Sequence, residues 1–278
     1  MNKLFLLPFL FLIFNLTAQK TYVPDDNFEQ ALIDLGHDDV LDDSVLTTNI
    51  NEVTTLFIAE KDISDLTGIE GFTSMQTLNC FLNHLTNIDV SQNTNLWRLV
   101  CYANDLTTLD LSQCPSITHV ECQYNDLQTL VPSPNLVNLN CQQNNLTELD
   151  LSNTPNLSYL DCDQNQLTCL NIKNGNSSSM GTTSFLARAN PNLFFIEVDD
   201  PLYSESTWIY VDTAVNFSAN CANACSSEIT NLIEFNASPR TLVGIIDMMG
   251  SETTFKPNTP LIYIYDDGSA EKVFSVEY

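Results

Sequence analysis

The sequence is poor in basic residues, and this limits the partners that it suits. Of its 278 residues 9 are Lys or Arg, whereas 35 are Asp or Glu, so the formal net charge is −26. A chain this acidic repels phosphate backbones, and its basic residues are scattered singly, so we exclude nucleic acid as a partner. Hydrophobic residues make up 44%, which is ordinary for a folded protein and too high for a disordered acidic chain.

Familiar catalytic motifs are absent as well. The sequence contains neither H-E-x-x-H nor G-x-S-x-G. Its histidines are His37, His84 and His119, and the last two lie in different parts of the chain with no repeated carboxylate or serine beside them. We therefore predict that the protein is not an enzyme and that it holds no cofactor.

One acidic run contains oxygen ligands of the kind that calcium prefers. It consists of Asp34, Asp38, Asp39, Asp42 and Asp43. The spacing does not match an EF-hand loop, because the glycine and the final glutamate are misplaced. We expect a solvated surface here and no metal site.

No apolar run reaches the ~20 residues that a transmembrane helix requires, so we predict no transmembrane span. The first residues instead have the pattern of an export signal. Lys3 is followed by the apolar run Leu4–Phe14, and Ala18 precedes Gln19. A charged start, a short apolar core and a small residue for cleavage are typical of a signal peptide. We predict a signal peptide over 1–18 and an exported mature protein.

The middle of the chain repeats itself. The frame Leu-x-Cys-x-x-Asn-x-Leu begins at Leu78 and recurs from Leu99, Val120, Leu139 and Leu160, with cysteines at 80, 101, 122, 141 and 162 and asparagines at 83, 104, 125, 144 and 165. A unit of this length cannot bury its apolar residues alone, whereas stacking at ~4.8 Å places each Leu and Cys over its neighbour. We expect one continuous core, a row of buried, reduced cysteines, and a ladder of Asn amides that bond the backbone of the turns above and below.

The full pattern, L-x-C-x-x-N-x-L-x-x-L-D-L-S-x-x-P-x-L, resembles the leucine-rich repeat family in its short bacterial form, from residue 56 to about 198. The resemblance implies a solenoid, a right-handed superhelix with a parallel β-sheet on its concave face and little helix. We place the repeats with their end turns at 56–220 and an N-terminal helical cap at 19–55. In the cap, Asp25 or Asp26 begins a short helix whose apolar residues, Phe28, Leu32 and Ile33, cover the open end of the core.

Four of the nine cysteines lie outside the row. Cys221 and Cys225, in C-x-x-x-C spacing beyond the repeats, are a possible disulfide in an exported protein. The sequence does not assign Cys114 or Cys169. Within the row, stacked strands hold Cβ atoms about 4.8 Å apart, slightly beyond the separation that a disulfide prefers.

The end of the chain departs from the repeat. We expect a linker over 221–238 and a small C-terminal β module over 239–278, with strands in Leu242–Met248, Leu261–Tyr265 and Val273–Val276. The module resembles the C-terminal sorting domain of type IX secretion substrates. The resemblance implies a Gram-negative host, recognition by the type IX secretion machinery, and secretion or attachment at the outer cell surface. The alternative is a β module that packs on the last repeat.

Side chains that alternate with the buried Leu and Cys face outward on the concave sheet, the usual binding surface of a solenoid. The candidate ligand-binding residues are Phe57, Phe81, Arg98, Tyr102, His119, Glu121, Tyr159, Asp161 and Asp163. Exposed rings at neighbouring strand positions suit an interface, so we expect Phe81 and Tyr102 to anchor a ligand. The alternative is that the cap or the loops near Trp97 shield them. We predict a non-catalytic, adhesin-like binding protein for an extracellular protein or glycan. A structural coat or spacer protein is the alternative, ahead of a secreted hydrolase.

Overall fold

The computed structural model describes residues 18–220, 242–247, 253–254, 261–265 and 270–273. The chain divides into two compact units, Met1–Ser226 and Ser227–Tyr278. The predicted signal peptide, apart from its last residue, and the predicted linker at 221–238 lie outside the described residues. Within the described residues no helix is long and apolar enough to cross a membrane.

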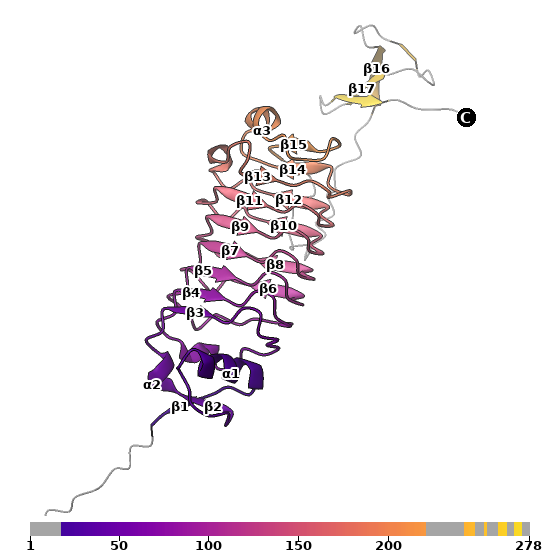
Figure 1. Ribbon diagram of the computed structural model, residues 1–278. Helices are drawn as coiled ribbons and strands as arrows, with labels where there is room; N and C mark the ends of the chain where they lie inside the picture. Colours follow the sequence, from indigo (N-terminus) through magenta and orange to yellow (C-terminus); the bar gives the residue numbers. More distant parts are fainter. Residues whose placement is uncertain (1–17, 221–241, 248–252, 255–260, 266–269, 274–278) are drawn as a thin grey trace, which may run out of the picture. The chain divides into compact units, whose positions relative to one another are not determined.

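The first unit is a solenoid of short parallel strands (Figure 1). Its main sheet has seven strands in the order β13-β11-β9-β7-β5-β4-β3. The central residues of neighbouring strands are in register, so Leu78 lies between Leu56 and Leu99 and all three are buried. The strands are β3 (Thr55–Phe57), β4 (Thr77–Asn79), β5 (Arg98–Val100), β7 (His119–Glu121), β9 (Asn138–Asn140), β11 (Tyr159–Asp161) and β13 (Phe185–Leu186). The predicted parallel sheet and continuous core are confirmed.

A second parallel sheet, which the sequence analysis did not predict, runs alongside the main sheet (Figure 1). It contains β10 (Glu148–Asp150), β12 (Cys169–Asn171), β14 (Phe195–Glu197) and β15 (Asn216–Ser218), while β6 (Thr108–Asp110) pairs with β8 (Thr129–Val131). The second apolar set of each repeat, such as Leu149 and Leu170, supplies the buried central residues of these strands. The apolar residues of both sheets therefore share one core.

The Asn ladder joins each turn to the one before it. Asn104 donates from Nδ2 to the carbonyls of Cys80 (3.0 Å) and Cys101 (3.1 Å) and accepts at Oδ1 from the Leu85 N–H (3.0 Å). The same bonds recur at Asn125, Asn144, Asn165 and Asn190. The predicted ladder is confirmed, but its side chains bond their own and the preceding turn, and it continues to Asn190.

A left-handed residue precedes every ladder asparagine. These residues have φ between 50° and 58° and none is glycine: Leu82, Ala103, Tyr124, Gln143, Gln164 and Ala189. Left-handed backbone is unfavourable for such residues. The hydrogen bonds of the next asparagine offset that cost.

The N-terminal segment contains β1 (Lys20–Tyr22) antiparallel to β2 (Ser44–Leu46), with the helices α1 (Asp26–Asp34) and α2 (Thr47–Ile50). Of the two candidate N-caps, Asp25 is the residue that accepts from the first N–H groups of α1. Phe28 and Leu32 are buried in the core, and the Phe28 ring stacks on Phe72 with centroids 6.4 Å apart. Ile33 stays partly exposed.

Glu29, on the same helix, is fully buried. Its carboxylate accepts from the N–H groups of Asp42 (3.0 Å), Asp43 (3.2 Å) and Ser44 (2.9 Å). The acidic run is therefore tied to α1 through its backbone. Within the described residues no group of three or more His, Cys, Asp or Glu is arranged to hold a metal ion.

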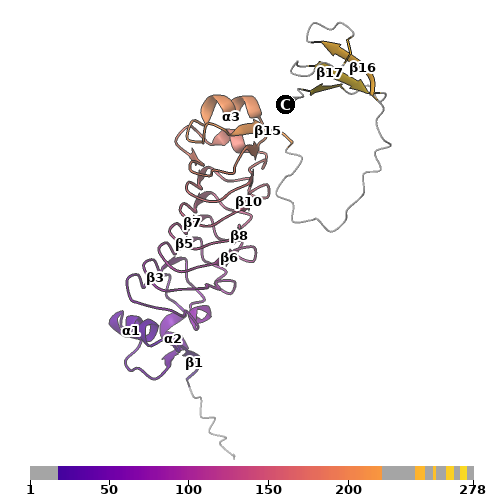
Figure 2. The same cartoon turned by 90° about the vertical axis from the view of Figure 1, so that its right-hand side faces the viewer.

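The helix α3 (Pro201–Thr207) lies at the opposite end of the solenoid from α1 (Figure 2). Trp208 follows it and is 1% exposed. The indole stacks on Phe185 with centroids 4.2 Å apart, and its Nε1 donates to the carbonyl of Met180 (2.9 Å). This helix was not predicted, because its short polar sequence has no apolar period. Two 3₁₀ turns, Ile69–Gly71 and Ser177–Ser179, are the other helical segments among the described residues of this unit.

The second unit contains the antiparallel strands β16 (Leu242–Asp247), β17 (Leu261–Tyr265) and β18 (Ala270–Val273). The first two agree with the predicted strands. The third begins at Ala270, earlier than predicted, and residues 274–276 lie outside the described residues.

Candidate ligand-binding face

Three aromatic rings form a row on the outer face of the main sheet, at its N-terminal end. Phe57 is 54% exposed, and its ring meets Phe81 edge-on with centroids 5.8 Å apart. Phe81 stacks on Tyr102 with centroids 4.6 Å apart and planes 8° from parallel. Phe81 and Tyr102 occupy the same position of successive turns, two residues after the paired Asn79 and Val100, whereas Phe57 pairs with Asn79 and lies diagonally beside Phe81. We call these three residues the aromatic row.

Polar residues continue the face on the next strands. Arg98 on β5 and Glu121 on β7 form an ion pair of 2.7 Å, with both side chains partly exposed. The rings of His119 and Trp97 are nearly perpendicular, with centroids 5.4 Å apart, and His119 Nδ1 lies 2.9 Å from Thr118 Oγ1. Trp97 is 41% exposed, and within the aromatic row Phe57 is exposed whereas Phe81 and Tyr102 are partly exposed.

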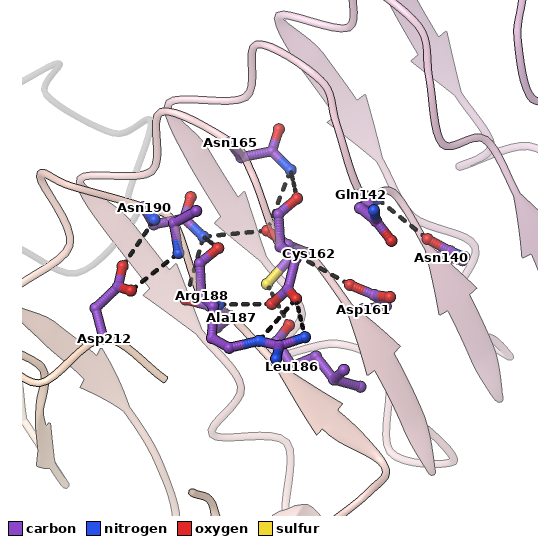
Figure 3. Close-up of polar contacts among 12 residues, drawn as sticks. Asn140, Gln142, Asp161, Cys162, Asn165, Leu186, Ala187, Arg188, Asn190 and Asp212 are labelled. Carbon is purple, nitrogen blue, oxygen red and sulfur yellow. Dashed lines mark hydrogen bonds and ion pairs between the residues drawn. The ribbon is translucent and has the colours of Figure 1, made fainter. Parts of the chain in front are cut away.

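Arg188 of the next turn, which is labelled in Figure 3, binds Asp163 at the C-terminal end of the face. Nε and Nη2 of Arg188 donate to Asp163 Oδ2 at 2.9 and 2.6 Å, and the backbone N–H of Arg188 donates to Oδ1 at 2.6 Å. The guanidinium also lies 5.1 Å from the centre of the Tyr210 ring. The hydrogen bond to Asp163 is the main reason why the pKa of Arg188 is raised.

Asp161 lies on the same strand as Tyr159 and has no direct ion pair among the described residues, although Arg188 is near enough to interact with its charge. Its Oδ1 accepts from the backbone N–H of Asp163 at 3.1 Å. Burial raises the pKa of the Asp161 carboxyl and, together with the two nearby carboxylates, the pKa of Tyr159. The structure contradicts the expectation that Asp161 and Asp163 point outward as exposed residues, since each is 6% exposed. The turn that carries Leu186 and Arg188 packs over them.

The structure thus distributes the predicted residues in two groups along one face. Phe57, Phe81 and Tyr102 touch, with Arg98, His119 and Glu121 beside them, whereas Tyr159, Asp161 and Asp163 lie farther along. The sequence analysis missed Arg188 and Tyr210. The sequence alone could have shown Arg188. In the last turn Ala187 takes the place of the row cysteine, so Arg188 comes directly after it, as Asp163 comes directly after Cys162.

The five cysteines of the row are fully buried and free. Burial raises the pKa of Cys80 and Cys122 to about 12 and raises those of Cys101, Cys141 and Cys162 even more clearly. A thiol that stays protonated is a poor nucleophile and metal ligand. The prediction of buried, reduced thiols that pack as apolar side chains is confirmed.

The other cysteines differ from the row and from one another. Cys114 is a buried free thiol, and Cys169 is disulfide-bonded. Cys221 and Cys225, the predicted pair, lie outside the described residues.

The repeat has relatives among known proteins. No protein-family model matches the chain. Internalin J of Listeria monocytogenes is 38% identical over 76 residues, which are 26% of this chain and 8% of internalin J. The solved functional domain of InlJ from Listeria monocytogenes, which includes a cysteine ladder, matches with a TM-score of 0.50 and 25% identity over 66% of this chain and 53% of that chain. A leucine-rich-repeat protein of Leptospira interrogans matches with a TM-score of 0.42 and 17% identity over 55% of this chain and 51% of that chain.

These matches define the extent of the similarity. This chain spans about half of the matched InlJ domain and a small part of the whole internalin J. The shared features are the parallel stack and the row of cysteines. The chain therefore has a leucine-rich-repeat solenoid fold, similar to that of the InlJ domain.

Proposed function

We propose that the protein is a non-catalytic, secreted or cell-surface binding protein that captures an extracellular partner on the outer face of the main sheet. The observation that carries the proposal is the aromatic row. Phe57 is more than half exposed, and Phe81 and Tyr102 are partly exposed beside it. Rings held in place by their neighbours lose little conformational entropy on binding, so they suit the anchor of an interface.

Export supports this proposal from the sequence side. The signal peptide predicted at 1–18 supports export of the protein from the cytoplasm. The resemblance of 239–278 to a sorting domain adds recognition by the type IX secretion machinery and the outer surface of a Gram-negative cell. Fusing 239–278 to a reporter and following its export in a type IX-competent cell and in a secretion-deficient one tests this part separately.

Binding is tested with the double variant Phe81→Ala/Tyr102→Ala on arrays of extracellular proteins and glycans. A partner that the wild-type protein captures should lose at least about tenfold in affinity, because aromatic anchors contribute about 2 kcal/mol or more. The control is Phe195→Ala, which removes a ring that is 55% exposed on β14 of the second sheet. Unchanged binding by a folded double variant contradicts the proposal and favours the coat or spacer alternative.

A further inference from the structure

The last turn of the solenoid leaves its core residues partly exposed. In the second sheet the central residues Leu170 and Ile196 are buried, whereas Phe217, which pairs with Ile196 from β15, is only partly buried. In the same turn Val211 pairs with the fully buried Ala187 and is itself partly exposed. Because β15 is the last strand of the described stack (Figure 1), no described turn covers these side chains, and the core is open at this end.

The N-terminal end of the stack is closed in comparison. Leu56, the central residue of the edge strand β3, is fully buried, and α1 contributes Phe28 to the core there. At the opposite end a cavity of about 340 Å³ remains beside α3, and its lining includes Ile209, Val215 and Phe217. Ile209 is 64% exposed. A stack of repeats needs a cover at both ends, so this apolar surface is suited to a partner.

The strand β15 also presents unpaired backbone groups at this end. The N–H of Asn216 donates to the carbonyl of Phe194 (2.9 Å), and the carbonyl of Ser218 accepts from the N–H of Val198 (2.9 Å), so both residues direct their backbone groups toward β14. Backbone groups alternate along a strand, so the N–H and C=O of Phe217 point away from β14, and they have no partner among the described residues. An unpaired strand edge is a template for another strand.

This edge lacks the charges that keep strand edges apart in many proteins. Residues 214–220 contain no Asp, Glu, Lys or Arg, in a chain whose formal net charge is −26. Of the two carboxylates in the cavity lining, Asp212 is bound within the chain, since it accepts from the N–H groups of Ala189 (2.9 Å) and Asn190 (2.8 Å). Glu205 is the other and is exposed. Two identical edges can therefore meet without placing like charges in the strands themselves.

We propose that this open end is an interface with a second copy of the chain, in which the two β15 strands pair antiparallel about Phe217. A two-fold axis places a strand antiparallel to itself, so each Phe217 N–H meets the Phe217 carbonyl of the other copy. The pairing joins the four-stranded sheets of the two copies and covers Ile209 and the cavity. Head-to-tail stacking is disfavoured, because the N-terminal end is closed. The inference goes beyond the proposed function, since the pair carries two aromatic rows and can bind a repetitive partner with avidity.

Sedimentation velocity of the full-length protein over a range of concentrations tests the interface. The variant is Ile209→Lys, which should fold because the side chain is exposed. The control is Val131→Lys, at an exposed apolar residue on β8, which adds the same charge away from β15. Amide hydrogen exchange of Phe217, measured at low and high protein concentration, reports the strand pairing separately and requires no variant.

Wild type and Val131→Lys should change from the mass of one chain to that of two as the concentration rises. Ile209→Lys should dissociate at least about tenfold more readily, because its ammonium group would be buried in the interface. Added salt should strengthen the wild-type dimer, since it screens the repulsion between two acidic chains. The Phe217 amide should exchange more slowly in the dimer.

Three results overturn the inference. They are a single chain at every concentration, dimerisation of Ile209→Lys equal to that of the wild type, and a dimer whose Phe217 amide exchanges as fast as in the single chain. A single chain whose Phe217 amide is already protected overturns it too, because another part of the same chain would then cover the edge. None of these results affects the proposed function, which depends on Phe81 and Tyr102.

Discussion

Replacing Asn104 with leucine should destabilise the solenoid mainly through three backbone groups, since its fourth bond, to the Tyr102 carbonyl, is long at 3.5 Å. The Leu85 N–H loses the one acceptor that it has, which costs about 1–3 kcal/mol for a buried donor. The carbonyls of Cys80 and Cys101 each lose one of two amide donors, because Asn83 and Asn125 still reach them. Each of these losses is worth about 0.5–1.5 kcal/mol. The free energy of unfolding should therefore fall by about 2–6 kcal/mol.

Urea unfolding followed by circular dichroism measures the total, and hydrogen exchange of the Leu85 amide measures the local effect. Exchange is informative because a stack of repeats need not unfold in one step. Asn145→Leu is the control, since its exposed amide bonds only the exposed Asp126 among the described residues, and it should change stability by less than about 0.5 kcal/mol. A loss below about 1 kcal/mol in Asn104→Leu, with Leu85 still protected, would refute the ladder as a source of stability.

Three further predictions concern the core and its two ends. Because burial raises the pKa of Cys122 from 9.0 to about 12, the folded state keeps a proton that the unfolded chain releases. The stabilisation should thus be complete below pH 9, and the free energy of unfolding should fall between pH 9 and 12 by up to ~1.4 kcal/mol per pH unit for each such thiol. Urea unfolding across this range should show that the free energy of unfolding falls less steeply with pH in Cys122→Ala. An equally steep fall contradicts the reasoning. Trp208→Ala should lower the free energy of unfolding by about 3–5 kcal/mol, measured by chemical unfolding. The control Trp97→Ala, at an exposed ring, should lower it by less than about 1 kcal/mol. Similar losses in the two variants would mean that Trp208 does not stabilise the end of the stack. Glu29→Gln puts an NH₂ group among three N–H donors and should lower the free energy of unfolding by about 1–3 kcal/mol, which is measured as a lower Tm. A Tm equal to that of the wild type would show that other contacts hold the loop at 42–44.

The main sheet was predictable because its positions are chemically distinct. Each turn buries a Leu, a Cys and an Asn at fixed spacing. Exposed positions do not require these three residue types at that spacing, so their recurrence indicates burial. The second sheet was harder to find, because segments such as Thr108–Asp110 and Glu148–Asp150 place one buried leucine between polar residues. Three residues are too few to show an alternating pattern. The contact between Trp208 and Phe185 joins distant parts of the chain, so local sequence carries no sign of it.

The part of the candidate site that depends only on the alternation of buried and exposed side chains could be predicted from the sequence. Alternation places Phe57, Phe81 and Tyr102 in one row, and the structure confirms their contacts. The burial of Asp161 and Asp163 depends instead on the turn with Arg188. That turn follows a polar insertion, and the repeat pattern alone does not show how close the turn packs.

The Asn ladder also has a consequence for the length of the molecule. Each asparagine completes the turn behind it with the same set of bonds, so any internal turn can follow any other. Removing one whole repeat, for example residues 102–122, would bring Asn125 onto Cys101 in the place that Asn104 occupies now. Recombination between such repeats can therefore remove or add whole turns, and each turn shortens or lengthens the binding face by about 4.8 Å. The junction between turns keeps the same asparagine hydrogen bonds.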